Sequence, residues 1–253
     1  MKILFIAPHL STGGLPQYLF WYLKQFNLPK SEVNVIEYSF TGNDYVIQKN
    51  KIKEIANVIT LGDEKSKLLE IINKLKPSVI HILEHPELFM DFELAKQIYQ
   101  LKDIHIVEST HTSTYDTKLK NFLPDKFILP CEFSSRSLFS YEIDTDVVEY
   151  THTPISITKE DAQKILGFDK NKKNIINVGL FTPGKNQAEV IQLARELSEV
   201  NFHFIGNQAQ NFEFYWKPLM ENLPKNCFIW GERNDVDLFY AEADLMYFPS
   251  KNE

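Results

Sequence analysis

Lys185 lies where a basic side chain can bind an anion. It follows an apolar run that ends at Gly179 and a short turn, and it precedes an amphipathic segment. The apolar residues of that segment recur at helical spacing, which predicts a helix over 187–199. The free N–H groups and the dipole at the start of a helix attract negative charge. Residues 174–197 therefore predict an anion site, although an ordinary strand–helix turn with a solvated lysine is the simpler interpretation of this stretch alone.

A second candidate site lies near the amino terminus. Residues 2–7 are continuously apolar, and Gly13 and Gly14 occupy the loop before an expected helix at 17–26. A continuous apolar run is typical of a strand buried on both faces of a parallel sheet. Two glycines between a strand and a helix let a ligand approach the backbone closely. A tight turn without a ligand explains the same pattern equally well.

Polar residues follow several of the expected strands. Glu84 and His85 come after the strand at 79–83, and His111 comes shortly after the strand at 104–107. Ligands of open parallel sheets bind outside the carboxyl ends of the strands. We expect a functional role for His111. For His85, and for His9 after the first strand, a structural role is the better interpretation.

Strands and helices alternate along the whole chain, which predicts an α/β protein with doubly wound parallel sheets. The irregular residues around 151–157 are the expected boundary between a domain at 1–153 and a second, incomplete domain at 154–253. Thr158 and Asp161 have the spacing of a helix cap. The expected strands lie at 2–7, 33–39, 56–61, 79–83, 104–107, 127–129, 147–150, 175–178, 203–205, 227–230 and 245–248, and the expected helices at 17–26, 65–75, 89–101, from about 134, 187–199, 212–221 and 236–241.

Composition limits the classes of protein. The 253 residues carry a formal net charge of −7, which argues against broad nucleic-acid binding. The two cysteines, Cys131 and Cys227, lack metal-ligand spacing and are expected to be reduced, buried thiols of a cytoplasmic protein. The amino terminus is expected to be a strand and not a signal peptide, and no apolar run is long enough for a membrane span.

Five segments occur in an order and spacing that resemble the retaining family 4 glycosyltransferases of the GT-B fold. They span nearly the whole chain, and their order is more specific than any one of them. The segments are STGGLPQ at 11–17, HTST at 111–114, INVGLFTPGKNQ at 176–187, FIGN at 204–207 and ADLMYFPSKNE at 243–253. The resemblance implies two Rossmann-like domains and a sugar transferred from a nucleotide-sugar donor such as a UDP- or GDP-sugar.

The resemblance also assigns roles to residues. Lys185 would bind the diphosphate of the donor, and the backbone at Gly13 and Gly14 would lie against the phosphates or the sugar. Catalytic roles at the transferred sugar would belong to His111 and Glu253. The remaining donor-site residues would be Gly206, Gly231 and Ser250.

Further expectations concern cofactors and partners. No metal or other cofactor is expected, because the lysine and the helix N-termini take the role that a divalent ion plays elsewhere. The acceptor would be a saccharide, a lipid-linked molecule or another small molecule. Peripheral contact with a membrane and the oligomeric state are left open.

Two departures from the family pattern keep alternatives open. Leu180 stands where family members usually carry an arginine, and the chain stops at Glu253, before the second glutamate of the usual Glu-x7-Glu pair. A truncated or fragmentary glycosyltransferase is the leading hypothesis. A non-catalytic nucleotide-sugar-binding protein is the alternative, and a nucleotide-sugar epimerase is disfavoured by the segments at 111–114 and 249–253. A structural module without a ligand is the least consistent with five segments in register.

Overall fold

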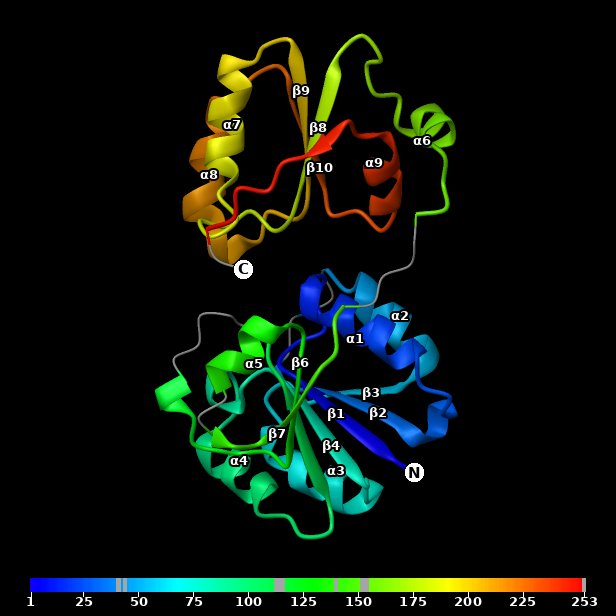
Figure 1. The fold of residues 1–253 in the computed structure, drawn as a ribbon, viewed down its shortest axis with the longest axis vertical. Coiled ribbons are helices and arrows are strands. Elements are labelled where there is room, and N and C mark those ends of the chain that lie inside the picture. Colours follow the sequence, from blue (N-terminus) through cyan, green and yellow to red (C-terminus); the bar gives the residue numbers. More distant parts are fainter. Residues whose placement is uncertain (40–41, 43–44, 112–116, 139–140, 151–154, 252–253) are drawn as a thin grey trace. The chain divides into compact units, whose positions relative to one another are not determined.

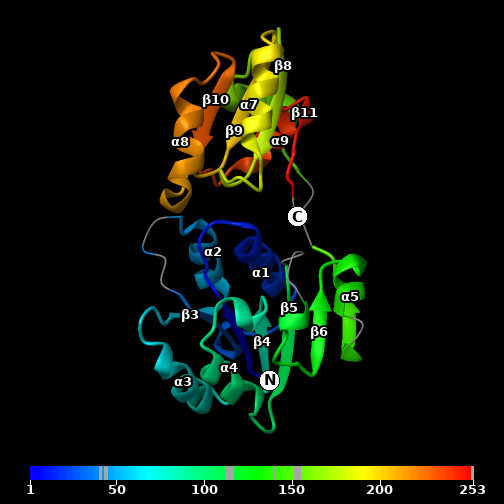
Figure 2. The same cartoon turned by 90° about the vertical axis from the view of Figure 1, so that its left-hand side faces the viewer.

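The computed structural model describes residues 1–39, 42, 45–111, 117–138, 141–150 and 155–251. They form two compact units, Met1–His152 and Thr153–Glu253 (Figure 1). Each unit contains one parallel sheet with helices on both of its faces (Figure 2). No helix of the described residues is long and apolar enough to cross a membrane.

The first unit has a seven-stranded sheet with the strand order β3-β2-β1-β4-β5-β6-β7, and all of its strand pairs are parallel. The order reverses direction between β1 and β4, which makes this a doubly wound sheet. The strands are β1 Ile3–Ala7, β2 Val33–Glu37, β3 Asn57–Thr60, β4 Val79–Leu83, β5 His105–Ser109, β6 Lys126–Leu129 and β7 Asp144–Val147.

Strand β1 is buried on both faces of this sheet. Its odd-numbered residues pack into one apolar cluster with Leu19 of α1 and Ile52 of α2, whereas Leu4 and Ile6 pack into another with α3 and α4. The continuous apolar run therefore has the expected structural cause, because neither face of the strand contacts water. The helices are α1 Gly14–Lys24, α2 Ile47–Ile55, α3 Leu68–Leu75, α4 Phe92–Tyr99 and α5 Glu132–Leu138, with short 3₁₀ turns at Lys30–Glu32, Lys65–Lys67, Pro86–Leu88 and Thr117–Leu119.

The second unit has a four-stranded parallel sheet with the order β10-β9-β8-β11. Helices α7 and α8 cover one face, and α6 and α9 cover the other (Figure 1). The strands are β8 Lys173–Val178, β9 Val200–Ile205, β10 Cys227–Gly231 and β11 Leu245–Met246. The helices are α6 Lys159–Leu166, α7 Gln187–Glu196, α8 Glu213–Glu221 and α9 Val236–Glu242, with a 3₁₀ turn at Gln210–Phe212.

Local details confirm some expectations and correct others. Thr158 caps α6, because its hydroxyl accepts the N–H of Asp161 at 3.1 Å. The expected helix at 187–199 ends already at Glu196, and the expected strand at 245–248 has only two residues. Both cysteines are free, but only Cys227 is buried. Cys131 is exposed because it precedes α5 at the end of β6, outside the apolar clusters.

Candidate functional site

The carboxyl ends of β8, β9 and β10 meet in a tight backbone contact. Gly179 donates its N–H to Ile205 O at 2.8 Å, and Gly206 donates its N–H to Gly231 O at 2.8 Å. A Cβ atom on Gly206 would lie 2.0 Å from the carbonyl oxygen of Gly179, and Gly206 has a φ of +153°. Only glycine fits here, so Gly206 joins the three strand ends into one compact backbone surface.

Lys185 lies in the loop that follows β8. Its backbone N–H donates a hydrogen bond to the hydroxyl oxygen of Thr182 at 3.2 Å, and its ammonium lies 4.9 Å from the centre of the Phe248 ring. Ser250 donates its hydroxyl to Gly184 O at 3.2 Å, and the N–H of Lys251 reaches the same oxygen at 2.8 Å. The segment after β11 therefore folds back over the Lys185 loop and brings Lys185 and Ser250 together.

One backbone N–H in the first turn of α7 already has a hydrogen-bond acceptor within the protein. The hydroxyl of Tyr215, from α8, accepts the N–H of Ala188 at 3.0 Å. Burial raises the pKa of Tyr215, so its hydroxyl stays neutral. Asn186 precedes the helix in a left-handed conformation with a φ of 57°. One donor of the first turn is thus satisfied inside the protein.

Several polar side-chain atoms at this edge of the small sheet are buried without a hydrogen-bond partner among the described residues. Leaving a buried polar group unpaired costs about 1–3 kcal/mol of folding free energy. A bound ligand that supplies the missing hydrogen-bond partner is one explanation for such atoms. Asn207 and Gln208 follow β9, Glu232 follows β10, and Gln187 begins α7. The atoms are Gln187 Oε1, Asn207 Oδ1, Gln208 Nε2 and Glu232 Oε1.

Arg233 follows the end of β10. Its guanidinium makes two hydrogen bonds to the Asp235 carboxylate, at 2.8 and 2.6 Å. It also packs 5.8 Å from the Trp230 ring centre and 5.5 Å from that of Phe239. Arg233 is therefore held by its own unit. Leu180 contributes only its backbone carbonyl, which accepts a hydrogen bond from the Gln187 amide at 3.0 Å.

The glycines of the first unit leave open space at the start of α1. Gly13 is the residue before α1, and Gly14 is its first residue. A Cβ atom on Gly14 would meet nothing within 4 Å, and one on Gly13 would meet only Ser11 O at 4.0 Å. Packing inside the unit does not require glycine at these positions. The absence of side chains leaves the backbone at the carboxyl end of β1 accessible.

The backbone of His111 is held by a carboxylate of the neighbouring strand end. Glu84 follows β4 and accepts the N–H of His111 at 2.8 Å and the hydroxyl of Thr110 at 3.2 Å. Glu84 is buried and has a φ of 86°, which is strained for a residue with a side chain. Two of the polar residues that sequence analysis placed at strand ends thus touch each other.

The His111 ring lies against two tyrosines. Its centre is 4.5 Å from that of Tyr18 and 5.6 Å from that of Tyr150, and its Nδ1 lies 2.6 Å from the Tyr150 hydroxyl. Burial lowers the pKa of His111 to about 4, so the ring is neutral at pH 7. Its Nε2 is buried and has no partner within the described part of the chain.

The other histidines near this edge take part in internal hydrogen bonds. His9 Nδ1 lies 2.8 Å from the Ser11 hydroxyl, and burial lowers the pKa of His9. His85 Nδ1 lies 2.7 Å from a carboxylate oxygen of Glu108. That carboxylate also accepts hydrogen bonds from Tyr99 at 2.6 Å and from the buried ammonium of Lys120 at 2.8 Å. His85 therefore belongs to a buried ionic network.

Some predicted residues lie outside the described residues, namely Glu253 and 112–114 of the HTST segment. No group of three histidine, cysteine, aspartate or glutamate side chains that could hold a metal ion occurs in the part of the chain that the structure describes.

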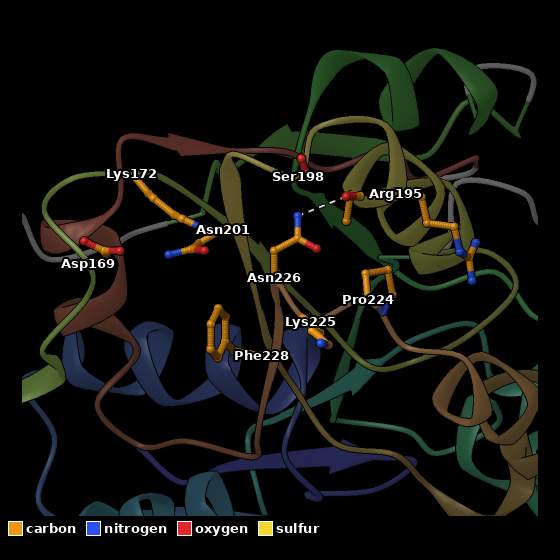
Figure 3. Close-up of a pocket in the computed structure, with 10 residues that line it drawn as sticks. Asp169, Lys172, Arg195, Ser198, Asn201, Pro224, Lys225, Asn226 and Phe228 are labelled. Atoms are coloured by element: carbon orange, nitrogen blue, oxygen red, sulfur yellow. Dashed lines mark hydrogen bonds between the residues drawn. The ribbon is translucent and has the colours of Figure 1, made fainter.

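Two cavities of the second unit lie at the opposite, amino-terminal ends of the strands. One of about 440 Å³ is lined by Asn201, Asn226 and Phe228 together with charged side chains (Figure 3). Another of about 550 Å³ is lined by Glu242, Asp244 and several lysines. Both are polar, and neither contains a residue that sequence analysis assigned to the donor site.

Part of the chain is similar to known proteins. Residues 158–253 match the family model described as Glycosyl transferases group 1. The chain is 33% identical over 95 residues to an alpha-galactosylglucosyldiacylglycerol synthase of Streptococcus pneumoniae, a match over 35% of this chain and 25% of that protein. It is 27% identical over 114 residues to a processive diacylglycerol alpha-glucosyltransferase of Acholeplasma laidlawii, over 44% of this chain and 33% of that protein. The matches thus cover a third or less of these relatives.

Solved structures resemble the fold of nearly the whole chain. The Anabaena HepE protein in complex with UDP-glucose has a TM-score of 0.77 at 17% identity, with 99% of this chain and 74% of that chain covered. Sucrose-phosphate synthase from Thermosynechococcus elongatus has a TM-score of 0.70 at 12% identity, with 99% and 76% covered. At these identities the likeness establishes the fold, which is the GT-B type with two Rossmann-like units.

Proposed function

We propose that the chain is all or the major part of a glycosyltransferase, because residues 158–253 match the family model of the glycosyl transferases group 1. It would transfer a sugar from a nucleotide-sugar donor to an acceptor and retain the configuration at the anomeric carbon. The retention is an implication of the resemblance to family 4, carried by the segments quoted above.

The observation that carries the proposal is the edge formed by the Lys185 loop and Gly206. A cation lies there beside a backbone surface that only glycine permits, and buried polar atoms without described partners follow β9 and β10 and begin α7. This set of groups suits a diphosphate with an attached nucleoside. The ammonium of Lys185 would stabilise the negative charge that develops on the leaving nucleotide. Gly206, Gly231 and Ser250 would border the donor.

The first unit would contribute the remaining groups. His111 would contact the transferred sugar, and the open backbone at Gly13 and Gly14 would contact the phosphates or the sugar. Glu253 would hydrogen-bond the transferred sugar, as the resemblance implies. No metal is part of the proposal, because the lysine supplies the positive charge at the diphosphate.

Relatives suggest the substrates. HepE was solved with UDP-glucose, so a UDP-sugar is the first donor to test. The two curated relatives are named for glycolipid products, so a diacylglycerol or glycosyl-diacylglycerol acceptor is proposed. Such an acceptor would place a cytoplasmic enzyme in peripheral contact with a membrane. A soluble saccharide acceptor would not require that contact.

Calorimetric titration of the purified chain with UDP, GDP and ADP tests donor binding. We expect one nucleotide to bind and Lys185→Ala to weaken it by about 2–4 kcal/mol, because a charge-assisted contact is lost. Lys225→Ala is the matched control, since Lys225 lies at the other end of the sheet, and should bind normally. Unchanged affinity of Lys185→Ala would remove this residue from the site.

Transfer is tested separately with UDP-glucose and vesicles that contain diacylglycerol. Nuclear magnetic resonance of the product should show the α-anomer if the configuration of the donor is retained. A β-anomer would contradict the retaining mechanism.

A second candidate function is a non-catalytic nucleotide-sugar-binding protein of the same fold. Leu180 supplies no charge, and Tyr215 occupies a donor at the N-terminus of α7, so the diphosphate would meet fewer positive groups than in the family pattern. This function predicts nucleotide binding without transfer or hydrolysis of the sugar. The non-catalytic function would be excluded if the wild-type chain turned over a nucleotide-sugar donor and Lys185→Ala abolished that turnover.

A further inference from the structure

The orientation of the His111 ring is fixed by aromatic contacts on the described part of the first unit. Tyr150 stacks on the ring with an interplanar angle of 23°, and Tyr18 packs against it at 58°. The carboxylate of Glu84 holds the backbone N–H of the same residue. Backbone and ring are therefore both restrained before any ligand binds.

The contact with Tyr150 also determines which ring nitrogen carries the proton. A neutral imidazole has one N–H donor and one acceptor nitrogen, and the bond made by one nitrogen sets the state of the other. Tyr150 Oη lies 2.6 Å from Nδ1. A phenol is a good donor, and an imidazole nitrogen is a stronger acceptor than a phenol oxygen. A hydroxyl that donates to Nδ1 places the proton of His111 on Nε2.

The other nitrogen is available to a ligand. His111 Nε2 is buried, and no described residue accepts a hydrogen bond from it. A buried N–H group without an acceptor is unfavourable, so a bound oxygen atom at this position would be stabilised.

We propose that Tyr150 is a positioning residue that holds His111 in the Nε2–H tautomer, so that Nε2 donates a hydrogen bond to an oxygen of the sugar donor. The part that concerns the donor rests on the proposed function. The part that concerns the tautomer rests only on contacts inside the first unit. Sequence patterns do not reveal this role, because Tyr150 is 39 residues away from His111 along the chain.

Nitrogen-15 magnetic resonance of the histidine rings tests the tautomer without any ligand. The His111 signals are assigned by their loss in His111→Gln. We expect the wild-type protein to show a protonated Nε2 and an unprotonated Nδ1. Tyr150→Phe removes the hydroxyl but keeps the ring, and it should shift the population toward the Nδ1–H tautomer. A wild-type ring protonated on Nδ1, or an unchanged spectrum in Tyr150→Phe, would overturn the proposal.

Tyr18→Phe is the matched control. Tyr18 packs on the same ring, but its hydroxyl bonds to Ser109. This variant should keep the Nε2–H tautomer. A loss of the tautomer in both variants would show that the Tyr150 hydroxyl does not select it by itself, which also contradicts the proposal.

Addition of UDP-glucose tests the role toward the donor. Calorimetry first establishes whether UDP-glucose binds, and an absence of binding counts against the proposed function. If it binds, the Nε2–H resonance of His111 should shift, and the affinity or turnover of Tyr150→Phe should fall about tenfold while Tyr18→Phe changes little. Binding without a shift of the Nε2–H signal would overturn the inference and leave the donor site at Lys185 intact.

Discussion

The carboxylate of Glu84 accepts the backbone N–H of His111 at 2.8 Å across the ends of two neighbouring strands. The same carboxylate accepts the Thr110 hydroxyl, and it is buried. Glu84→Ala would leave the N–H of His111 without this acceptor. We expect the free energy of unfolding to fall by about 1–3 kcal/mol, measured by urea denaturation.

Glu84→Gln is the control for this prediction. The amide oxygen of glutamine can still accept the N–H of His111, so the loss should be clearly smaller than in Glu84→Ala. Equal losses in both variants would show that the negative charge matters and not the acceptor oxygen.

Gly206 has the strictest steric requirement among the predicted site residues. Gly206→Ala would place a Cβ 2.0 Å from the Gly179 carbonyl oxygen, so the backbone would have to move. We expect a loss of about 3 kcal/mol or more from overpacking and backbone strain. Thermal unfolding of the second unit measures it. Gly231→Ala, where a Cβ would meet open space and φ is +69°, should cost about 1–2 kcal/mol. A Gly206→Ala protein as stable as Gly231→Ala would contradict this assignment.

Substitution of Gly14 should affect the stability of the protein and its affinity for a donor differently. Because a Cβ atom there meets nothing within 4 Å, Gly14→Ala should leave the stability unchanged or raise it by up to about 1 kcal/mol. If the donor approaches this backbone as proposed, the added methyl group should weaken UDP-glucose binding about tenfold, or 1.4 kcal/mol. Calorimetry and thermal unfolding of the same sample measure the two effects. Unchanged affinity would remove Gly14 from the donor site.

His203 makes the second unit sensitive to acid. Trp230 donates to its Nδ1 at 3.1 Å, so its Nε2–H donates to Asn174 Oδ1, also at 3.1 Å. Burial lowers the pKa of His203 from 6.5 to about 4. Below pH 6.5 the His203 ring is therefore protonated in the unfolded chain but stays neutral in the folded chain. The stability that is present above pH 6.5 is lost as the pH falls toward 4. Between pH 7 and pH 5 we expect this one group to lower the free energy of unfolding by about 2 kcal/mol.

Urea denaturation at the two pH values checks this effect against His203→Gln, which cannot titrate. The variant should show a pH dependence smaller by about the same amount. An identical pH dependence in both proteins would show that folding does not lower the pKa of His203.

Much of the fold followed from apolar patterning. Buried strands such as β1 are continuous apolar runs, and α7 has its apolar residues on one face, so both were predicted close to their observed bounds. Helix α2 was not predicted, because IQKNKIKEI carries three lysines and only three isoleucines. It packs through Ile52, which lies in the same apolar cluster as the odd-numbered residues of β1.

The site residues likewise divide into those that a local sequence pattern could indicate and those that it could not. Lys185 was recognisable because a cation in the loop between a strand and a helix has a local physical meaning, whereas the resemblance of the FIGN segment was needed to assign Gly206 to the site. The contacts of Tyr215 with α7 and of Tyr150 with His111 join residues 27 and 39 positions apart. They depend on how packed elements meet, so no local pattern could predict them.

The hydrogen bonds from Ser250 and Lys251 to the Gly184 carbonyl close a loop of 66 residues. Contacts between such distant positions are slow to form, because the intervening chain must first be ordered. During synthesis the Lys185 loop would therefore leave the ribosome well before the residues that brace it. The first unit can fold while the second is still being made. The Lys185 loop should accordingly be braced only after the residues that follow β11 have been made.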